Sequence, residues 1–99
     1  MRLHFDAHCH LPEARSWLPE QVRVVCGTCE ADWEAVLAHV ASETQVIPML
    51  GLHPWFVAAA QPGWEARLDA LLRAHRAGVG ECGLDFAREA ADRPAQEQA

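Results

Sequence analysis

The sequence of 99 residues contains no lysine and no tyrosine, and its 14 acidic residues outnumber 8 basic residues, all of them arginine. The formal net charge is −6 at pH 7. No basic cluster is present of the kind that binds nucleic acid by neutralising phosphates, so metal ions would have to supply most of the positive charge for any bound phosphodiester. An apolar run of about 18 residues, which a membrane-spanning helix needs, and a signal-peptide pattern are also lacking. These absences predict a cytoplasmic protein with no membrane partner.

The composition is that of one globular domain or a piece of a larger one. Hydrophobic residues make up 51% of the chain and charged residues 22%, which provides enough apolar side chain for a core. Nothing in the sequence indicates an oxidising compartment, so the 4 cysteines are expected to be free thiols.

Short apolar runs alternate with amphipathic segments, and this order predicts an α/β fold. Strands are expected at Leu3–Phe5, Val22–Cys26, Val46–Leu50 and Val79–Leu84. Helices are expected at Ala31–Ser42 and from Trp64 to about Ala77. Apolar residues at helical spacing line one face of each helix, namely Trp33, Val36, Leu37 and Val40 in the first and Trp64, Leu68, Leu71 and Leu72 in the second.

Prolines and a glycine indicate where these elements bend, end or begin. The segment between the first two strands is polar and holds Pro12 and Pro19. Pro48 lies within the third run and cannot donate a ladder hydrogen bond, so this strand is expected to be irregular or paired differently there. Gly78 stands where a left-handed cap would end the second helix. Pro94 favours the start of a third helix, since proline is tolerated in a first turn.

Two histidines follow the first strand, at His8 and His10. Alternate residues of an extended segment point to the same side, so both imidazoles can face one metal ion. The pair alone is equally consistent with histidines that face solvent. Asp6 has the same alternation and could orient or bridge the ligands, which favours the metal interpretation. His4 has it too, but is expected to pack within the strand.

Glu81 lies in the glycine-rich fourth run, GECGLD. A carboxylate there would be costly to bury unless a positive group faces it. We interpret that group as a metal ion, with an arginine as the alternative. Asp85, at the end of the same run, could support the site or cap the element that follows.

His53 lies just after the third strand, in the turn Gly51–Trp55, of sequence GLHPW. The strand ends of parallel β/α sheets converge at the binding site, although a lone histidine in a turn is usually a surface residue. The segment Cys26–Cys29 has the spacing of a redox or zinc motif. Because the sequence offers it no partner motif, incidental thiols are the favoured interpretation.

Taken together, these segments resemble the ordered motif set of the TatD family of metal-dependent hydrolases. The motifs are FDAHCHL at Phe5–Leu11, GLHPW at Gly51–Trp55 and VGECGLD at Val79–Asp85, and Ala31–Trp33 is also similar. The resemblance covers the chain from about Leu3 to Ala99. It implies a TIM barrel, two divalent ions (magnesium, manganese or zinc) and a deoxyribonuclease of the 3′ exonuclease type that cleaves phosphodiester bonds with metal-activated water.

The resemblance also implies roles for individual residues. His8 and His10 match the first pair of metal ligands, and Glu81 matches the carboxylate that bridges the two ions. His53 matches a catalytic histidine near the substrate phosphate. Two divalent ions would also supply the positive charge that the sequence lacks.

The chain is shorter than the barrel that the resemblance implies. A TIM barrel takes about 250 residues, so residues 1–99 are expected to be an N-terminal portion that stops after about the fourth strand. The first half of a (β/α)8 barrel would leave strand edges and its inner face uncovered. We therefore expect self-association through the open edges, and little or no activity from this chain alone.

Two other functions remain open. A related metalloenzyme of the amidohydrolase type, acting on C–N bonds, could share the pair of histidines on the same barrel, since a fold does not fix the substrate. A non-enzymatic thiol or zinc-binding module could instead be built on Cys26 and Cys29.

Overall fold

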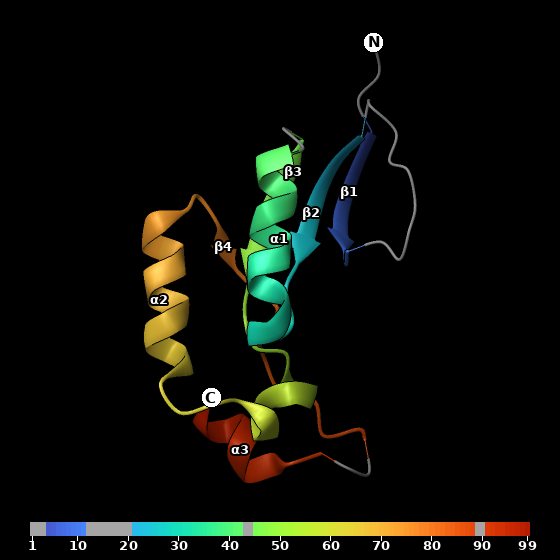
Figure 1. The fold of residues 1–99 in the computed structure, drawn as a ribbon. Helices are drawn as coiled ribbons and strands as arrows, with labels where there is room; N and C mark the ends of the chain where they lie inside the picture. The colour runs from blue at the N-terminus through green and yellow to red at the C-terminus, as the bar shows by residue number, and fades with distance from the viewer. Residues whose placement is uncertain (1–3, 12–20, 43–44, 89–90) are drawn as a thin grey trace.

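A computed structural model describes residues 4–11, 21–42, 45–88 and 91–99. Its strands are β1 (His4–Cys9), β2 (Gln21–Cys26), β3 (Val46–Leu50) and β4 (Gly78–Val79). Its helices are α1 (Glu30–Ser42), α2 (Trp64–Ala74) and α3 (Arg93–Gln98), with a 3-10 helix, η1 (Pro54–Ala59), after β3. The strands form one parallel sheet in the order β1-β2-β3-β4 (Figure 1). The predicted α/β alternation is confirmed.

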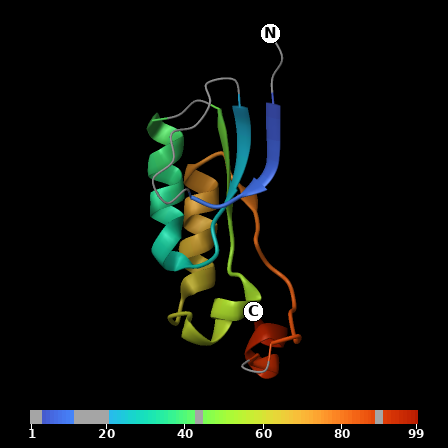
Figure 2. The same ribbon diagram turned by 90° about the vertical axis from the view of Figure 1, so that its right-hand side faces the viewer.

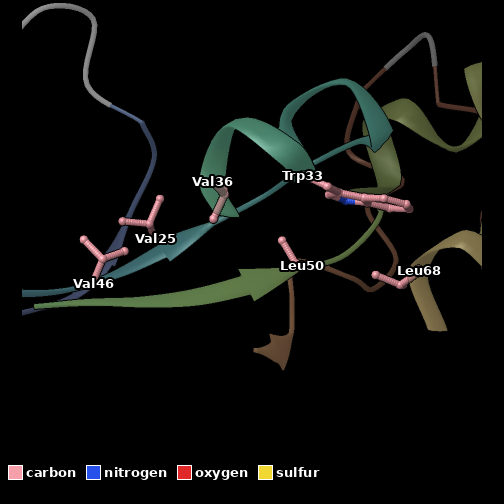
Figure 3. Close-up of a cluster of buried hydrophobic side chains, with 6 residues drawn as sticks. All are labelled: Val25, Trp33, Val36, Val46, Leu50 and Leu68. Atoms are coloured by element: carbon pink, nitrogen blue, oxygen red, sulfur yellow. The ribbon is translucent and has the colours of Figure 1, made fainter. Parts of the chain in front are cut away.

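The core lies between the sheet and two helices, α1 and α2, which are on the same side of the sheet (Figure 2). Its buried side chains are Val25, Val46 and Leu50 from the sheet, Trp33 and Val36 from α1, and Leu68 from α2 (Figure 3). The partly buried residues packed against them include Leu37, Val40, Trp64, Leu71 and Leu72. The apolar stripes predicted on both helices therefore face the sheet, where their removal from water stabilises the fold.

The opposite face of the sheet is exposed. Phe5 is 71% exposed and Ile47 47%. No helix of the described ranges packs on this face (Figure 2), and β1 and β4 each pair on one side only. His4, which was expected to pack within the strand, is exposed as well.

Several predicted boundaries are wrong. β1 continues to Cys9 instead of ending at Phe5. α2 ends at Ala74 rather than near Ala77, because His75 adopts an extended conformation. Gly78 is not a left-handed cap, because it begins β4 and pairs with Met49 of β3. A Cβ atom at Gly78 would meet the flexible end of the Met49 side chain, with Cε at 2.8 Å, and not the backbone of β3. β4 has only 2 residues, and the rest of the predicted fourth run is a loop.

Pro48 lies within β3 without interrupting it. The register of β2 with β3 continues through the proline, which is paired with Val25. Pairing with β4 begins only at Met49, after the proline. β3 is thus paired differently on its two sides at this position, as expected for a residue without a backbone donor.

The third helix starts where the sequence predicts. α3 has Pro94 in its first turn, and the side chain of Asp92 caps its N-terminus. None of the helices in the described ranges is long and apolar enough to cross a membrane. Leu3, Pro12 and Pro19, predicted in the first strand and the segment after it, lie outside the described residues.

Candidate metal centre

Three potential metal ligands come together where the strands end. His8 and His10 are at the end of β1, and Glu81 follows β4. Nε2 of His8 is 3.6 Å from Oε1 of Glu81, and Nε2 of His10 is 3.3 Å from Oε2. One donor atom from each residue lies within 4.8 Å of the other two. Two imidazole nitrogens and a carboxylate suit a divalent metal ion, so these residues fit the predicted cofactor.

An irregularity in β1 determines which way the two histidines face. Asp6 is in register with Arg23 of β2 but Cys9 is in register with Val25, so three steps along β1 match two along β2. Such a β-bulge interrupts the alternation of side chains. The simple alternation that placed Asp6 on the side of both histidines therefore does not hold. Asp6 instead accepts a hydrogen bond from the backbone N–H of His8, at 3.2 Å.

Contacts with Cys26 of β2 orient both histidines. Nδ1 of His10 is 3.1 Å from the carbonyl oxygen of Cys26. A carbonyl oxygen can only accept, so this hydrogen bond places the proton on Nδ1 and leaves the lone pair on Nε2. Nδ1 of His8 is 3.4 Å from Sγ of the same cysteine. Both Nε2 atoms are thereby directed at the carboxylate of Glu81.

His53 lies beside the cluster, and its two ring nitrogens have the opposite hydrogen-bonding roles to those of His10. It is the N-cap of η1, and its Nδ1 accepts a hydrogen bond from the backbone N–H of Trp55 at 3.1 Å. In the neutral imidazole the proton is then on Nε2, which is 4.0 Å from Oε1 of Glu81. The backbone N–H of His53 donates to the carbonyl oxygen of Thr28 at 2.8 Å. His53 therefore presents a hydrogen-bond donor to the site rather than a lone pair for a metal.

Glu81 is held at the end of β3 through the backbone. Its N–H donates to the carbonyl oxygen of Gly27 at 3.1 Å, and the N–H of Gly80 donates to that of Leu50 at 2.9 Å. A Cβ atom at Gly51 would lie 2.6 Å from the carbonyl carbon of Gly80, so the approach of this segment requires glycine. Within the described ranges, the ion pairs of Glu81 are with histidines and none is with an arginine.

Asp85 is outside the ligand cluster and reaches it through Trp55. Its Oδ2 accepts a hydrogen bond from Nε1 of Trp55 at 2.9 Å, and this indole meets the ring of His53 edge-on, with 5.0 Å between centroids. Its Oδ1 accepts from the backbone N–H of Ala87 at 3.0 Å. The hydrogen bond from Ala87, followed by that from Trp55, lowers the pKa of Asp85. Asp85 does not cap the following helix, because Asp92 does.

Gln96 of α3 is a supporting residue that the sequence did not reveal. Its side chain is buried, with Oε1 accepting from the N–H of Asp85 at 2.7 Å and Nε2 donating to the carbonyl oxygen of Asp85 at 2.9 Å. A glutamine in a polar, alanine-rich segment carries no pattern that distinguishes it from its neighbours. Its role depends on where α3 packs.

The cysteines form no metal site of their own. All four are free, and no group of potential ligands in the described ranges includes a cysteine. Burial, followed by the negative charge of Glu81, raises the pKa of the Cys26 thiol, which disfavours the thiolate form that binds zinc or reacts with disulfides.

In the same segment, Thr28 donates from its N–H and Oγ1 to Asp32, at 3.0 and 2.7 Å, and so ties the loop to α1.

The cluster borders a cavity of about 460 Å³. Residues of the candidate site line it together with two aromatic side chains; among them are His10, His53, Glu81, Trp55 and Phe56. Both aromatic side chains are exposed to solvent. The cavity has the size of a site for a small ligand.

Comparison with known families identifies the chain. The family model for TatD-related DNases matches residues 5–99. A search of curated proteins and a search of solved structures each found no match. The matched range contains the three candidate ligands His8, His10 and Glu81, and also His53. The chain therefore belongs to the TatD-related DNase family.

Proposed function

We propose that the protein is a metal-dependent hydrolase that cleaves phosphodiester bonds, as a deoxyribonuclease of the 3′ exonuclease type. The observation that carries the proposal is the cluster of His8, His10 and Glu81 beside His53 and a cavity of about 460 Å³. Parallel β/α folds bind their ligands at the carboxyl ends of the strands. Membership of the family supports the class of reaction.

The chain's own residues would hold the ions through three donor groups. Nε2 of both histidines and the carboxylate of Glu81 would bind magnesium, manganese or zinc. Oε1 of Glu81 is turned toward His8 and Oε2 toward His10. Such ions supply Lewis acidity and activate water at neutral pH. They would also attract a phosphate to a chain with a net charge of −6.

His53 would act on the substrate rather than on the metal. Because its Nδ1 accepts from Trp55, its Nε2 proton is available for a phosphate oxygen placed beside Glu81. A fixed donor directed at an oxygen that gains negative charge stabilises the transition state. This assignment gives His53 a catalytic role without making it a ligand.

We also propose that residues 1–99 form the N-terminal half of a (β/α)8 barrel. Support comes from the parallel strand order, the two helices on one side and the family. The side chains of His8 and His10 are 55% and 53% exposed, so water would compete with a substrate at this site. We therefore expect this chain alone to have little or no activity, and to associate with a second copy through its uncovered sheet.

Metal binding tests the proposal without depending on turnover. Calorimetric titration of the full chain with zinc should show binding that His8→Ala with His10→Ala weakens by more than about 100-fold, since the loss of even one supporting residue usually costs 10- to 100-fold. His75→Ala removes an exposed histidine after α2 and should leave the affinity unchanged. Zinc binding that survives the histidine changes but disappears in Cys26→Ser with Cys29→Ser would overturn the proposal in favour of a thiol module.

The choice of substrate requires an assay of its own. Because we expect little or no activity from this chain alone, the assay uses a large excess of protein over single-stranded DNA labelled at either end, with magnesium or manganese, and any nucleotides that are released should come from the 3′ end. A cyclic amide offered under the same conditions should stay intact. Hydrolysis of the amide but not of the DNA would favour the alternative enzyme that acts on C–N bonds.

A further inference from the structure

An exposed aromatic side chain is hydrogen-bonded at the edge of the candidate metal centre. Trp55 is 50% exposed, yet its Nε1 donates to Asp85 at 2.9 Å and its ring lies 5.0 Å from that of His53. An indole offers a large apolar surface and loses little side-chain entropy on binding. Tryptophan fixed by its polar end with its rings in solvent is therefore typical of a binding surface.

The support of this side chain extends to a buried residue. The amide of Gln96 bonds to both the N–H and the carbonyl oxygen of Asp85, and the carboxylate of Asp85 also accepts from Ala87. Packing alone would not explain this arrangement, because half of the indole remains uncovered. The hydrogen bonds instead fix the orientation of a ring that stays accessible.

The side chain of Trp55 lines two cavities with different neighbours. The guanidinium of Arg88 lies 4.4 Å from the ring centroid. Arg88 and Trp55 together line a small cavity of about 100 Å³ that does not include the metal ligands. Trp55 also lines the larger cavity with His10 and Glu81, and Arg88 does not. Arg88 therefore contacts the indole where it borders the small cavity, and the candidate ligands lie in the lining of the larger one.

We propose that Trp55 is a stacking platform for a nucleobase of the bound nucleic acid, with the adjoining phosphate directed at His53 and at the ions that His8, His10 and Glu81 would hold. This inference rests on the proposed function. His53 contacts the indole, and its Nε2 is 4.0 Å from Glu81, so one nucleotide could reach both groups. Every base has a π face, so stacking gives affinity without sequence preference and without basic side chains. Asp85 and Gln96 are positioning residues for this platform.

Binding of a nucleotide with and without its base tests the platform. The full chain is titrated calorimetrically, in magnesium, with deoxyadenosine 5′-monophosphate, with 2-deoxyribose 5-phosphate and with deoxyadenosine. Trp55→Ala should weaken the binding of the nucleotide about 5- to 150-fold, the range for loss of one stacked base, and leave that of the sugar phosphate unchanged. Trp55→Phe should retain part of the preference. Leu84→Ala removes another exposed apolar side chain, outside the cavity lining, and serves as the matched control.

A second variant tests the positioning role without removing the ring. Asp85→Ala takes away the acceptor of the indole N–H, so the NMR signal of that N–H should move, and the preference for the nucleotide over the sugar phosphate should fall by less than in Trp55→Ala. The same spectra show whether each variant is folded. An unchanged preference with a displaced indole signal would overturn the role of Asp85.

The outcomes separate this inference from the proposed function. Equal affinity for nucleotide and sugar phosphate, or equal losses of both in Trp55→Ala, would overturn the platform while magnesium-dependent phosphate binding still stood. Binding of deoxyadenosine that depends on Trp55, with no magnesium-dependent binding of the sugar phosphate, would support the platform and count against the proposed function. Loss of every interaction would overturn both.

Discussion

The face of the sheet beneath α1 and α2 buries Val25 and Leu50 completely, whereas the opposite face leaves Phe5 and Ile47 largely in solvent. Phe5 and Ile47 are as apolar as Val25 and Leu50, so the hydrophobicity of these side chains alone does not distinguish the two faces. The difference lies in what each face packs against. The covered face stabilises this chain, and the exposed face can contribute only when something else covers it.

The largest expected effect comes from the covered face. Trp33 of α1 is buried in the core and donates from Nε1 to the carbonyl oxygen of Gly51 at 2.7 Å. Trp33→Ala should lower the free energy of unfolding by about 3 to 5 kcal/mol, because it leaves a cavity and an unpaired carbonyl. Urea unfolding followed by circular dichroism measures the loss.

The same measurement on Ile47 sharpens the comparison. Ile47→Ala removes apolar atoms from the exposed face, so at a protein concentration at which the chain is monomeric it should lower the free energy of unfolding by less than about 1 kcal/mol. Similar losses in the two variants would show that both faces are buried in solution. The conclusion that only one face of the sheet is buried would then be wrong.

The periodicity of the apolar residues was enough to predict which side of α1 is buried against the sheet. The spacing of Trp33 and Val36 placed both on the buried side of α1, and β3 has the predicted bounds of Val46–Leu50. The error at Gly78 has a different origin, because pairing with Met49 of β3 rather than local preference decides the backbone there. Such pairing depends on a strand distant in sequence, so no local pattern could reveal it.

At the strand ends we expect a loss of stability smaller than that of Trp33→Ala, together with a large effect on the candidate metal centre. A Cβ atom at Gly51 would meet the backbone of Gly80, with the carbonyl carbon at 2.6 Å and the oxygen at 2.8 Å. Gly51→Ala should therefore displace Glu81, lower the free energy of unfolding by about 1 to 3 kcal/mol and weaken zinc binding by about 10-fold or more. Urea unfolding and calorimetry measure the two effects.

Gly63 provides the matched control for this substitution. It has a φ of 82° before α2, and no backbone atom crowds its Cβ position. Gly63→Ala should cost about 1 kcal/mol of stability through backbone strain, with unchanged affinity for zinc. Equal losses of zinc affinity in the two variants would mean that instability, rather than the position of Glu81, weakens the site.

The site was less predictable than the core. The sequence singled out His8, His10 and Glu81, and the structure brings them together at one edge of the sheet. Strict alternation could not anticipate the bulge in β1, since a bulge depends on pairing with β2. Nor could it show that Gln96 supports Asp85, because this contact requires the packing of α3.

The smallest expected effect on folding, and the most direct test of the exposed face, comes from a charge at Ile47. If a second copy covers this face, Ile47→Lys places two like charges in a desolvated interface and should raise the dissociation constant at least about tenfold. Ala38→Lys makes the same change of charge at an exposed position of α1 and should leave association unchanged. Sedimentation velocity over a range of concentrations measures both. A wild-type chain that stays monomeric at every concentration and unfolds cooperatively would show that the helix-covered core is sufficient, and the proposed self-association would be wrong.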